Sequence, residues 1–266
     1  MTHVRVPTPC YNRTNPFMAS NVQRPKVPVE ELATQCRDAM VPLTSRFVYF
    51  STVPIADDDL RSYLNDPIAA ISPAIVSVLP PMAIILAPYL ERGNGKGGDI
   101  LTFDRPAEAR QLSWTRRAVG DMTVLALGIK EIEVADYHYQ FYNALSRFVS
   151  ELWTDDLRER FYRTIREELS AEVHGEVDER SWHLKQALQR RQTNVRKETK
   201  LFRDYARQSF EDTLTLYMHG TCCDIDVDTG PRQMPSRYLR RRLELLVAMF
   251  PPPEGFAVLP EQLKTR

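Results

Sequence analysis

Histidine, cysteine and carboxylate side chains gather near both ends of a long charged segment in the C-terminal half of the chain. Their nitrogen, sulfur and oxygen atoms are the donors that zinc and iron take in proteins. The candidate ligands of a divalent metal cofactor are Glu168, Glu172, His174, His219 and Cys222. We expect them to meet only if the two ends of the segment are brought together.

The spacing of these residues matches no common metal motif. The chain has no H-E-x-x-H and no C-x-x-C sequence. Asp224, Asp226 and Asp228 resemble the start of a calcium loop, but the glycine at the sixth place and the glutamate at the twelfth are missing. An acidic, solvated loop that follows two buried thiols is the alternative interpretation.

A thiol nucleophile is a further possibility. Cys222 or Cys223 could be activated by His219, since a thiolate needs a nearby base or positive charge. Other catalytic signatures are absent: the chain has no G-x-S-x-G, and the glycine-rich loop at residues 93–98 has neither the P-loop spacing nor the dinucleotide fingerprint. We interpret that loop as a hairpin connection.

Two helices are expected to position the candidate residues. The first should begin at Thr154, an N-cap residue followed by two aspartates, and should end near Val173 before His174 and Gly175. The second spans residues 182–218, which contain no proline or glycine and predict one helix about 55 Å long. Its apolar residues lie at its ends, so its polar middle should be exposed or covered by a partner.

Charge is divided between these two helices. Residues 151–180 hold ten acids and five arginines, whereas residues 185–207 hold eight bases and two acids. The helices could pack as an antiparallel hairpin, the basic helix could face an anionic partner, or arms from two chains could pair. The candidate basic surface consists of Arg190, Arg191, Arg196, Lys197, Lys200 and Arg203.

The sequence of the N-terminal half predicts a small sheet with helices. Strands are expected at residues 47–50, 82–86, 111–117 and 122–130, the last two joined by a turn at Gly120-Asp121. Helices are expected at residues 30–40, 57–65, 73–79 and 137–152. Three acids at 57–59 suit a helix N-terminus. A final helix should run from Ser236 to Phe250.

The fold class predicted is α+β, with a small mixed or antiparallel sheet in the N-terminal half and a long helical hairpin arm in the C-terminal half. The expected divisions are a tail at 1–29, an α+β domain at 30–152, a helical region at 153–250 and a proline-rich tail at 251–266.

Composition indicates an ordinary soluble protein. The formal net charge is zero, so any electrostatic attraction to nucleic acid must be local. Four cysteines, two of them adjacent, suggest a reducing cytoplasm rather than a disulfide framework. Residues 67–90 carry no charge, but their five prolines argue against a membrane span.

Three functions therefore stay open. The first is a non-catalytic interaction or scaffold protein that uses the long charged helix to bind a protein partner or a second copy of itself. The second is a metal-dependent enzyme with a Glu/His/Cys site at the base of the helical arm. The third is nucleic-acid binding through the basic helix.

Overall fold

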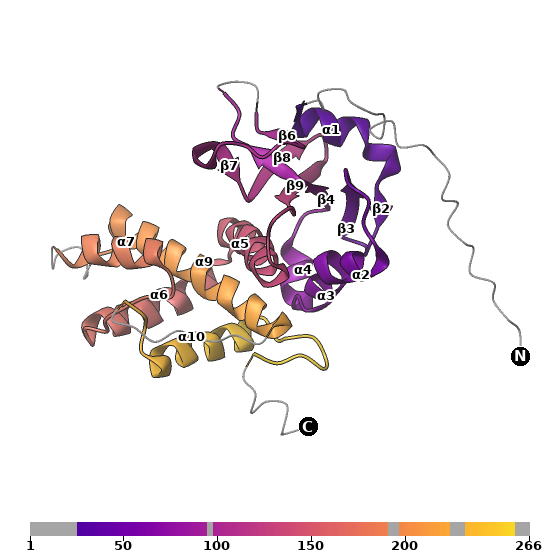
Figure 1. The fold of residues 1–266 in the computed structure, drawn as a ribbon. Helices are drawn as coiled ribbons and strands as arrows, with labels where there is room; N and C mark the ends of the chain where they lie inside the picture. The colour runs from indigo at the N-terminus through magenta and orange to yellow at the C-terminus, as the bar shows by residue number, and fades with distance from the viewer. Residues whose placement is uncertain (1–25, 95–97, 191–196, 224–231, 259–266) are drawn as a thin grey trace, which may run out of the picture.

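The computed structural model describes residues 26–94, 98–190, 197–223 and 232–258. Two sheets occupy the N-terminal half, and long helices make up the C-terminal half (Figure 1). The predicted α+β class is therefore confirmed. Part of the predicted N-terminal tail (residues 1–25), the glycine-rich residues 95–97, Asp224–Asp228 and the end of the C-terminal tail lie outside the described residues.

The larger sheet has five strands and is mixed. They are β2 (Val41–Pro42), β3 (Phe47–Ser51), β4 (Met82–Ala87), β9 (Met122–Gly128) and β8 (Trp114–Val119), in that order across the sheet. The central pairs β3–β4 and β4–β9 are parallel, with Ile84 opposite both Tyr49 and Leu125. The outer pairs are antiparallel, and β8 and β9 form the predicted hairpin around Gly120 and Asp121.

A smaller antiparallel sheet lies beside it. Its strands are β1 (Val27–Pro28), β6 (Ile100–Thr102), β5 (Tyr89–Glu91) and β7 (Gln111–Leu112), in that order. The pairing of β5 with β6 confirms that the glycine-rich segment connects a hairpin.

Both faces of the central strands are buried. Side chains alternate between the faces of a strand, so Ile84 lies in the core that contains helix α5 (Val134–Leu152) and Ile85 lies in the core that contains helix α1 (Val29–Gln35). A strand covered on both sides reads as a continuous apolar run, as β4 does.

Short helical turns connect β3 to β4. They are α2 (Asp57–Leu60), the π-helical turn η3 (Arg61–Asn65), α3 (Asp66–Ala69) and α4 (Pro73–Val78). The three acids at 57–59 lie in the first turn of α2, as expected for a helix N-terminus. Short 3₁₀ turns occur at η2 (Arg37–Ala39) and η5 (Glu108–Arg110).

In the described ranges α5 is followed by α6 (Asp155–Ser170), α7 (Glu179–Gln189), α9 (Lys200–Cys222) and α10 (Ser236–Met249). Thr154 caps α6 by accepting a hydrogen bond from the Leu157 N–H, and Asp178 caps α7 with Ser181 in a capping box. After α6 the chain turns at Glu172 and Gly175, both with positive φ, and Gly175 lies directly against the Gln233 backbone. The first helix thus ends earlier than predicted.

The single helix predicted for residues 182–218 is wrong, because this stretch forms α7 and α9. Thr199 begins α9 by accepting a hydrogen bond from the Phe202 N–H. In one continuous helix Leu188 and Phe202 would lie about 21 Å apart. The break lets both side chains be fully buried in the same core, and α7 packs against α9 (Figure 1).

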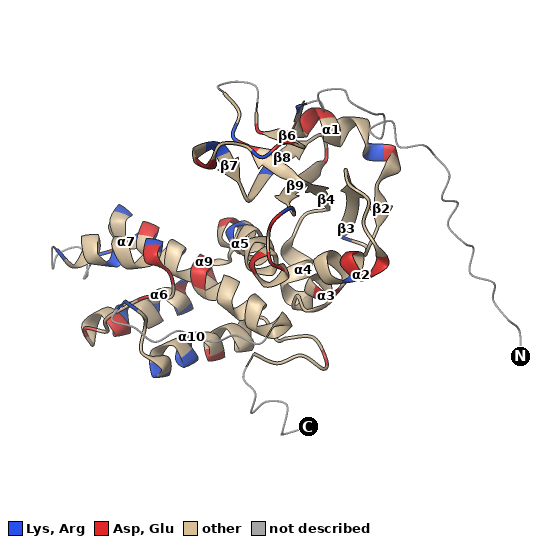
Figure 2. Cartoon of the chain, viewed as in Figure 1, with Lys and Arg blue, Asp and Glu red and all other residues tan. Residues whose placement is uncertain are grey.

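None of the helices in the described ranges is long and apolar enough to cross a bilayer. The uncharged stretch at 67–90 instead contributes α4 and the buried strand β4. Charged residues of both signs lie along α6, α7 and α10 (Figure 2).

Candidate metal centre

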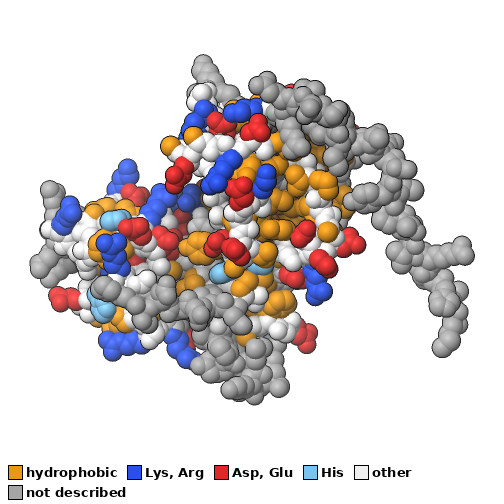
Figure 3. Space-filling view, in the orientation of Figure 1, with side chains coloured by type: hydrophobic (Ala, Val, Ile, Leu, Met, Phe, Trp, Pro, Cys, Tyr) orange, Lys and Arg blue, Asp and Glu red, His pale blue; other side chains and the backbone are white. Residues whose placement is uncertain are grey.

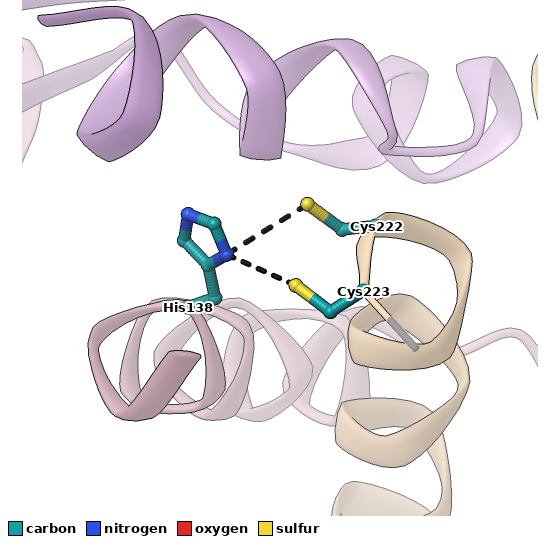
Figure 4. Close-up of side chains that lie close together, drawn as sticks. All are labelled: His138, Cys222 and Cys223. Carbon is teal, nitrogen blue, oxygen red and sulfur yellow. Dashed lines mark hydrogen bonds between the residues drawn. The ribbon is translucent and has the colours of Figure 1, made fainter. Parts of the chain in front are cut away.

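Three side chains of the types that ligate metals meet where the start of α5 approaches the end of α9 (Figure 4). The Nδ1 atom of His138 lies 3.1 Å from Cys223 Sγ and 3.8 Å from Cys222 Sγ. The three ligand atoms all lie within 4.8 Å of one another. Over the described ranges, this is the one group of three or more histidine, cysteine or carboxylate side chains close enough to share an ion.

The end of α9 explains how two adjacent cysteines reach one ring. Successive residues of a helix point about 100° apart, because one turn takes 3.6 residues. Cys222 is the last helical residue, and Cys223 is the C-cap with extended backbone angles, φ −131° and ψ 150°. That change of conformation lets the second sulfur face the same nitrogen as the first (Figure 4).

Packing between α5 and α9 holds the two sides of the site together. Ser146 on α5 and Thr215 on α9 share a hydrogen bond of 3.0 Å between their hydroxyl oxygens, and both side chains are fully buried. His138 itself is only 6% exposed, whereas both cysteines are partly exposed. The histidine is therefore more deeply buried than the two cysteines.

A backbone carbonyl sets the orientation of His138. The Nε2 atom lies 2.7 Å from the carbonyl oxygen of Ser62. A carbonyl can only accept, so Nε2 carries the hydrogen and the neutral ring has its lone pair on Nδ1, facing the sulfurs. A hydrogen bond from the second ring nitrogen is the usual companion of a metal-binding histidine.

The pKa values at the centre shift toward a charged pair. Burial lowers the pKa of His138, but hydrogen bonds to Cys222 and the Ser62 carbonyl outweigh it, and the net pKa is raised. Burial raises the pKa of Cys222, but the hydrogen bond and the charge of His138 outweigh it, and the net pKa is lowered. Thiolate is the form of cysteine that binds metals and attacks electrophiles.

His219 lies beside the centre without joining its ligand group. Its ring contacts the rings of Tyr139 and Tyr142, with centroids 5.9 Å and 6.4 Å apart. Burial, followed by the charge of His138, lowers the pKa of His219. Its buried Nε2 atom has no hydrogen-bond partner among the described residues.

The five predicted metal ligands do not come together. Cys222 belongs to the centre, but Glu172 and His174 are exposed in the turn after α6. Glu168 is fully buried and receives three hydrogen bonds from Arg242, so its carboxylate is already neutralised. The histidine that contacts the thiols is His138, where His219 was expected.

Glu168 instead belongs to a buried ionic cluster inside the helical region. Arg242 also donates to Glu176, at 2.9 Å and 3.0 Å, and Lys185 lies 3.3 Å from Glu176. The cluster holds two buried cations and two buried carboxylates and is therefore neutral overall. Because Arg242 is wholly inaccessible, we assign this cluster to stability rather than to ligand binding.

The candidate basic surface is only partly described. Arg190, Lys197, Lys200 and Arg203 are exposed near the ends of α7 and α9, whereas Arg191 and Arg196 lie outside the described residues. The Arg203 guanidinium donates to the Glu198 carbonyl at 2.9 Å. On the face shown in Figure 3, basic and acidic side chains alternate without a large patch of one sign.

Comparison with known proteins adds no functional information: no family model, no curated protein and no solved structure matches this chain.

Sequence reasoning missed His138, and it considered Cys223 only as a nucleophile and not as a metal ligand. His138 lies 85 residues before Cys223 and falls within an aromatic helix that carries no metal motif. The adjacent cysteines after a helix were the available signal, and they identified one side of the site. Only the packing of α5 on α9 supplies the other side.

Proposed function

We propose that the protein binds a thiophilic metal ion, with zinc as the first candidate, through His138, Cys222 and Cys223. The convergence of one imidazole nitrogen and two sulfurs within 4.8 Å supports this proposal.

The donor set favours zinc over harder ions. Zinc binds imidazole and thiolate, whereas calcium and magnesium take oxygen ligands. Two thiolates would neutralise the charge of a divalent ion, and the lone pair of His138 Nδ1 already faces them. Three protein ligands leave a fourth position for water or a substrate, which is the arrangement of catalytic zinc sites.

Metal content is the direct test. We expect the full chain, prepared without a His-tag or chelator, to carry about one zinc per chain, and cobalt to give a thiolate charge-transfer band. Cys222→Ser, Cys223→Ser and His138→Gln should each lower zinc affinity by at least about tenfold, because each removes one of three ligands. The measurements are elemental analysis and competition with a chromogenic chelator.

Matched controls separate this site from other thiols and from the predicted ligands. Cys36→Ser alters a buried cysteine of the other core, and Glu172→Gln with His174→Ala alters exposed residues after α6. Both controls should retain zinc. A wild-type protein that takes up no zinc even when zinc is supplied, or a double serine variant that binds it equally well, would refute the proposal.

A thiol nucleophile is the second candidate, supported by the 3.1 Å contact between Cys223 Sγ and His138 Nδ1. The Ser62 carbonyl orients the base, as the third member of a nucleophile–base pair does. In metal-free protein, iodoacetamide should alkylate Cys222 or Cys223 well before Cys36, whose pKa burial raises to about 11. Equal rates in the wild type and His138→Ala, measured by mass spectrometry, would remove this candidate.

Partner binding and nucleic-acid binding stay predictions of the sequence. The continuous polar helix that motivated them is divided between α7 and α9. A cytoplasmic location is part of our proposal, because four cysteines in 266 residues, two of them adjacent, suit a reducing compartment better than a disulfide framework.

A further inference from the structure

We propose that Pro67 positions His138 for ligand binding, because proline leaves the Ser62 carbonyl without a helical donor. This inference rests on the proposed function where it concerns metal affinity. The part of the inference that concerns the orientation and tautomer of the His138 ring can be tested without metal.

The argument begins in the π-helical turn η3. In this turn the Asp66 N–H donates to the carbonyl of Arg61, five residues earlier. The next bond of the same series would join the N–H of residue 67 to the carbonyl of Ser62. Proline has no N–H, so the series stops and the Ser62 carbonyl is left open. π-helical turns occur often at functional sites.

His138 supplies the missing donor. Its Nε2–H lies 2.7 Å from the Ser62 oxygen, and the ring is 6% exposed. Buried carbonyl groups are rarely left unpaired, so the proline and the imidazole complement each other. The pairing crosses 76 residues of sequence and joins the turn before α3 to the first turns of α5.

The proline also anchors the neighbouring residue of α5. The Tyr142 hydroxyl, one turn after His138, donates to the Pro67 carbonyl at 3.0 Å. Pro67 is itself buried. Two side chains on one face of α5 are thus held by carbonyls of the same short segment, and the His138 ring has its Nδ1 directed at the cysteines.

Any other residue at position 67 would restore an N–H that competes for the Ser62 carbonyl. His138 would then be free to rotate or to carry its hydrogen on Nδ1, which removes the lone pair that faces the sulfurs. Loss of such an outer hydrogen bond typically weakens metal binding by about 10- to 100-fold.

The experiment compares Pro67→Ala and Pro67→Val in the full chain. We expect both to weaken zinc affinity about 10- to 100-fold, and nitrogen-15 NMR of the metal-free proteins to show His138 changing from the Nε2–H tautomer to a mixture. Valine preserves more side-chain volume than alanine. Equal losses of zinc affinity in both variants therefore indicate that the restored N–H is the cause. A clearly larger loss for alanine than for valine would instead indicate lost packing and would contradict the proposal.

Two control variants leave the carbonyl arrangement intact. Ser62→Ala removes a hydroxyl that bonds to the Asp58 carbonyl but keeps the Ser62 oxygen. Pro73→Ala adds an N–H at the exposed first position of α4, where helices leave that group unbonded. Both should bind zinc as the wild type does.

The zinc affinity and the His138 tautomer test two different parts of the proposal, so either part can be refuted without the other. An unchanged tautomer in both Pro67 variants would overturn the positioning role, whatever happens to zinc. A wild type that binds no zinc but holds His138 as the Nε2–H tautomer, which the Pro67 variants lose, would support the positioning role while refuting the metal site.

Discussion

Arg242→Met should lower the free energy of unfolding by about 3–5 kcal/mol, one of the largest effects available in this chain. The variant leaves the carboxylates of Glu168 and Glu176 buried without their principal cation. An uncompensated buried charge is strongly unfavourable, whereas the intact cluster contributes little beyond neutrality. Chemical denaturation followed by circular dichroism measures the change.

The position of Arg242 explains why the effect should spread through the helical region. Its guanidinium on α10 reaches Glu168 on α6, Glu176 before α7, and the hydroxyls of Ser209 and Thr213 on α9. Tyr205 also donates to Glu176. Loss of the arginine thus removes bonds that join three helices and a loop at one point.

The adjacent residue is a matched control. Arg241 lies on the same helix and pairs with Glu167, but about half of each side chain is exposed. Exposed ion pairs contribute about 0–1 kcal/mol, so Arg241→Met should change stability by less than about 1 kcal/mol. Combining Arg242→Met with Glu168→Gln should recover part of the loss, and equal effects of the two arginine variants would contradict the argument.

Sequence reasoning succeeded where a local signal decides the structure. Such local signals depend only on residues that are close together in the sequence. They include the apolar runs of β4 and β9, the Gly120-Asp121 turn and the Thr154 cap. These features placed the strands and the start of α6. The parallel pairing at the centre of the sheet depends on distant segments, and the prediction accordingly left mixed and antiparallel sheets open.

Tertiary packing decided the features that were missed. Residues 182–218 contain no helix breaker, yet α7 ends at Gln189 and α9 begins at Lys200, with Leu188 and Phe202 buried in the same core. His138 likewise carries no sign in the sequence that it faces the cysteines. Its role follows from the contact of α5 with α9 and from the Ser62 carbonyl.

Asp212→Asn should stabilise the protein at pH 8 and leave its stability nearly unchanged at pH 4. Asp212 is 2% exposed on α9; its Oδ1 accepts a hydrogen bond from Gln208 at 2.7 Å, while its Oδ2 has no partner in the described part of the chain. Burial raises its pKa to about 7, outweighing the hydrogen bond from Gln208, and the nearby Asp178 and Glu176 raise it further.

The sign follows from proton binding. Between about pH 4 and pH 7 the unfolded chain ionises this aspartate while the folded protein keeps it protonated, so the folded state binds more protons and stability falls as pH rises. Each pKa unit corresponds to about 1.4 kcal/mol, so the full penalty above pH 7 is on the order of 4 kcal/mol. Asparagine resembles the protonated acid and removes that penalty.

Asp204→Asn provides the control, because Asp204 is exposed on the same helix. Unfolding free energies of the wild type and both variants, measured from pH 4 to pH 8, isolate the effect of each residue, since all other groups titrate alike. The difference between Asp212→Asn and the wild type should grow through this range, and that for Asp204→Asn should stay constant. An Asp212→Asn variant that follows the wild type at every pH would show that the buried carboxylate is ionised without penalty, and the helical core would then have to solvate it.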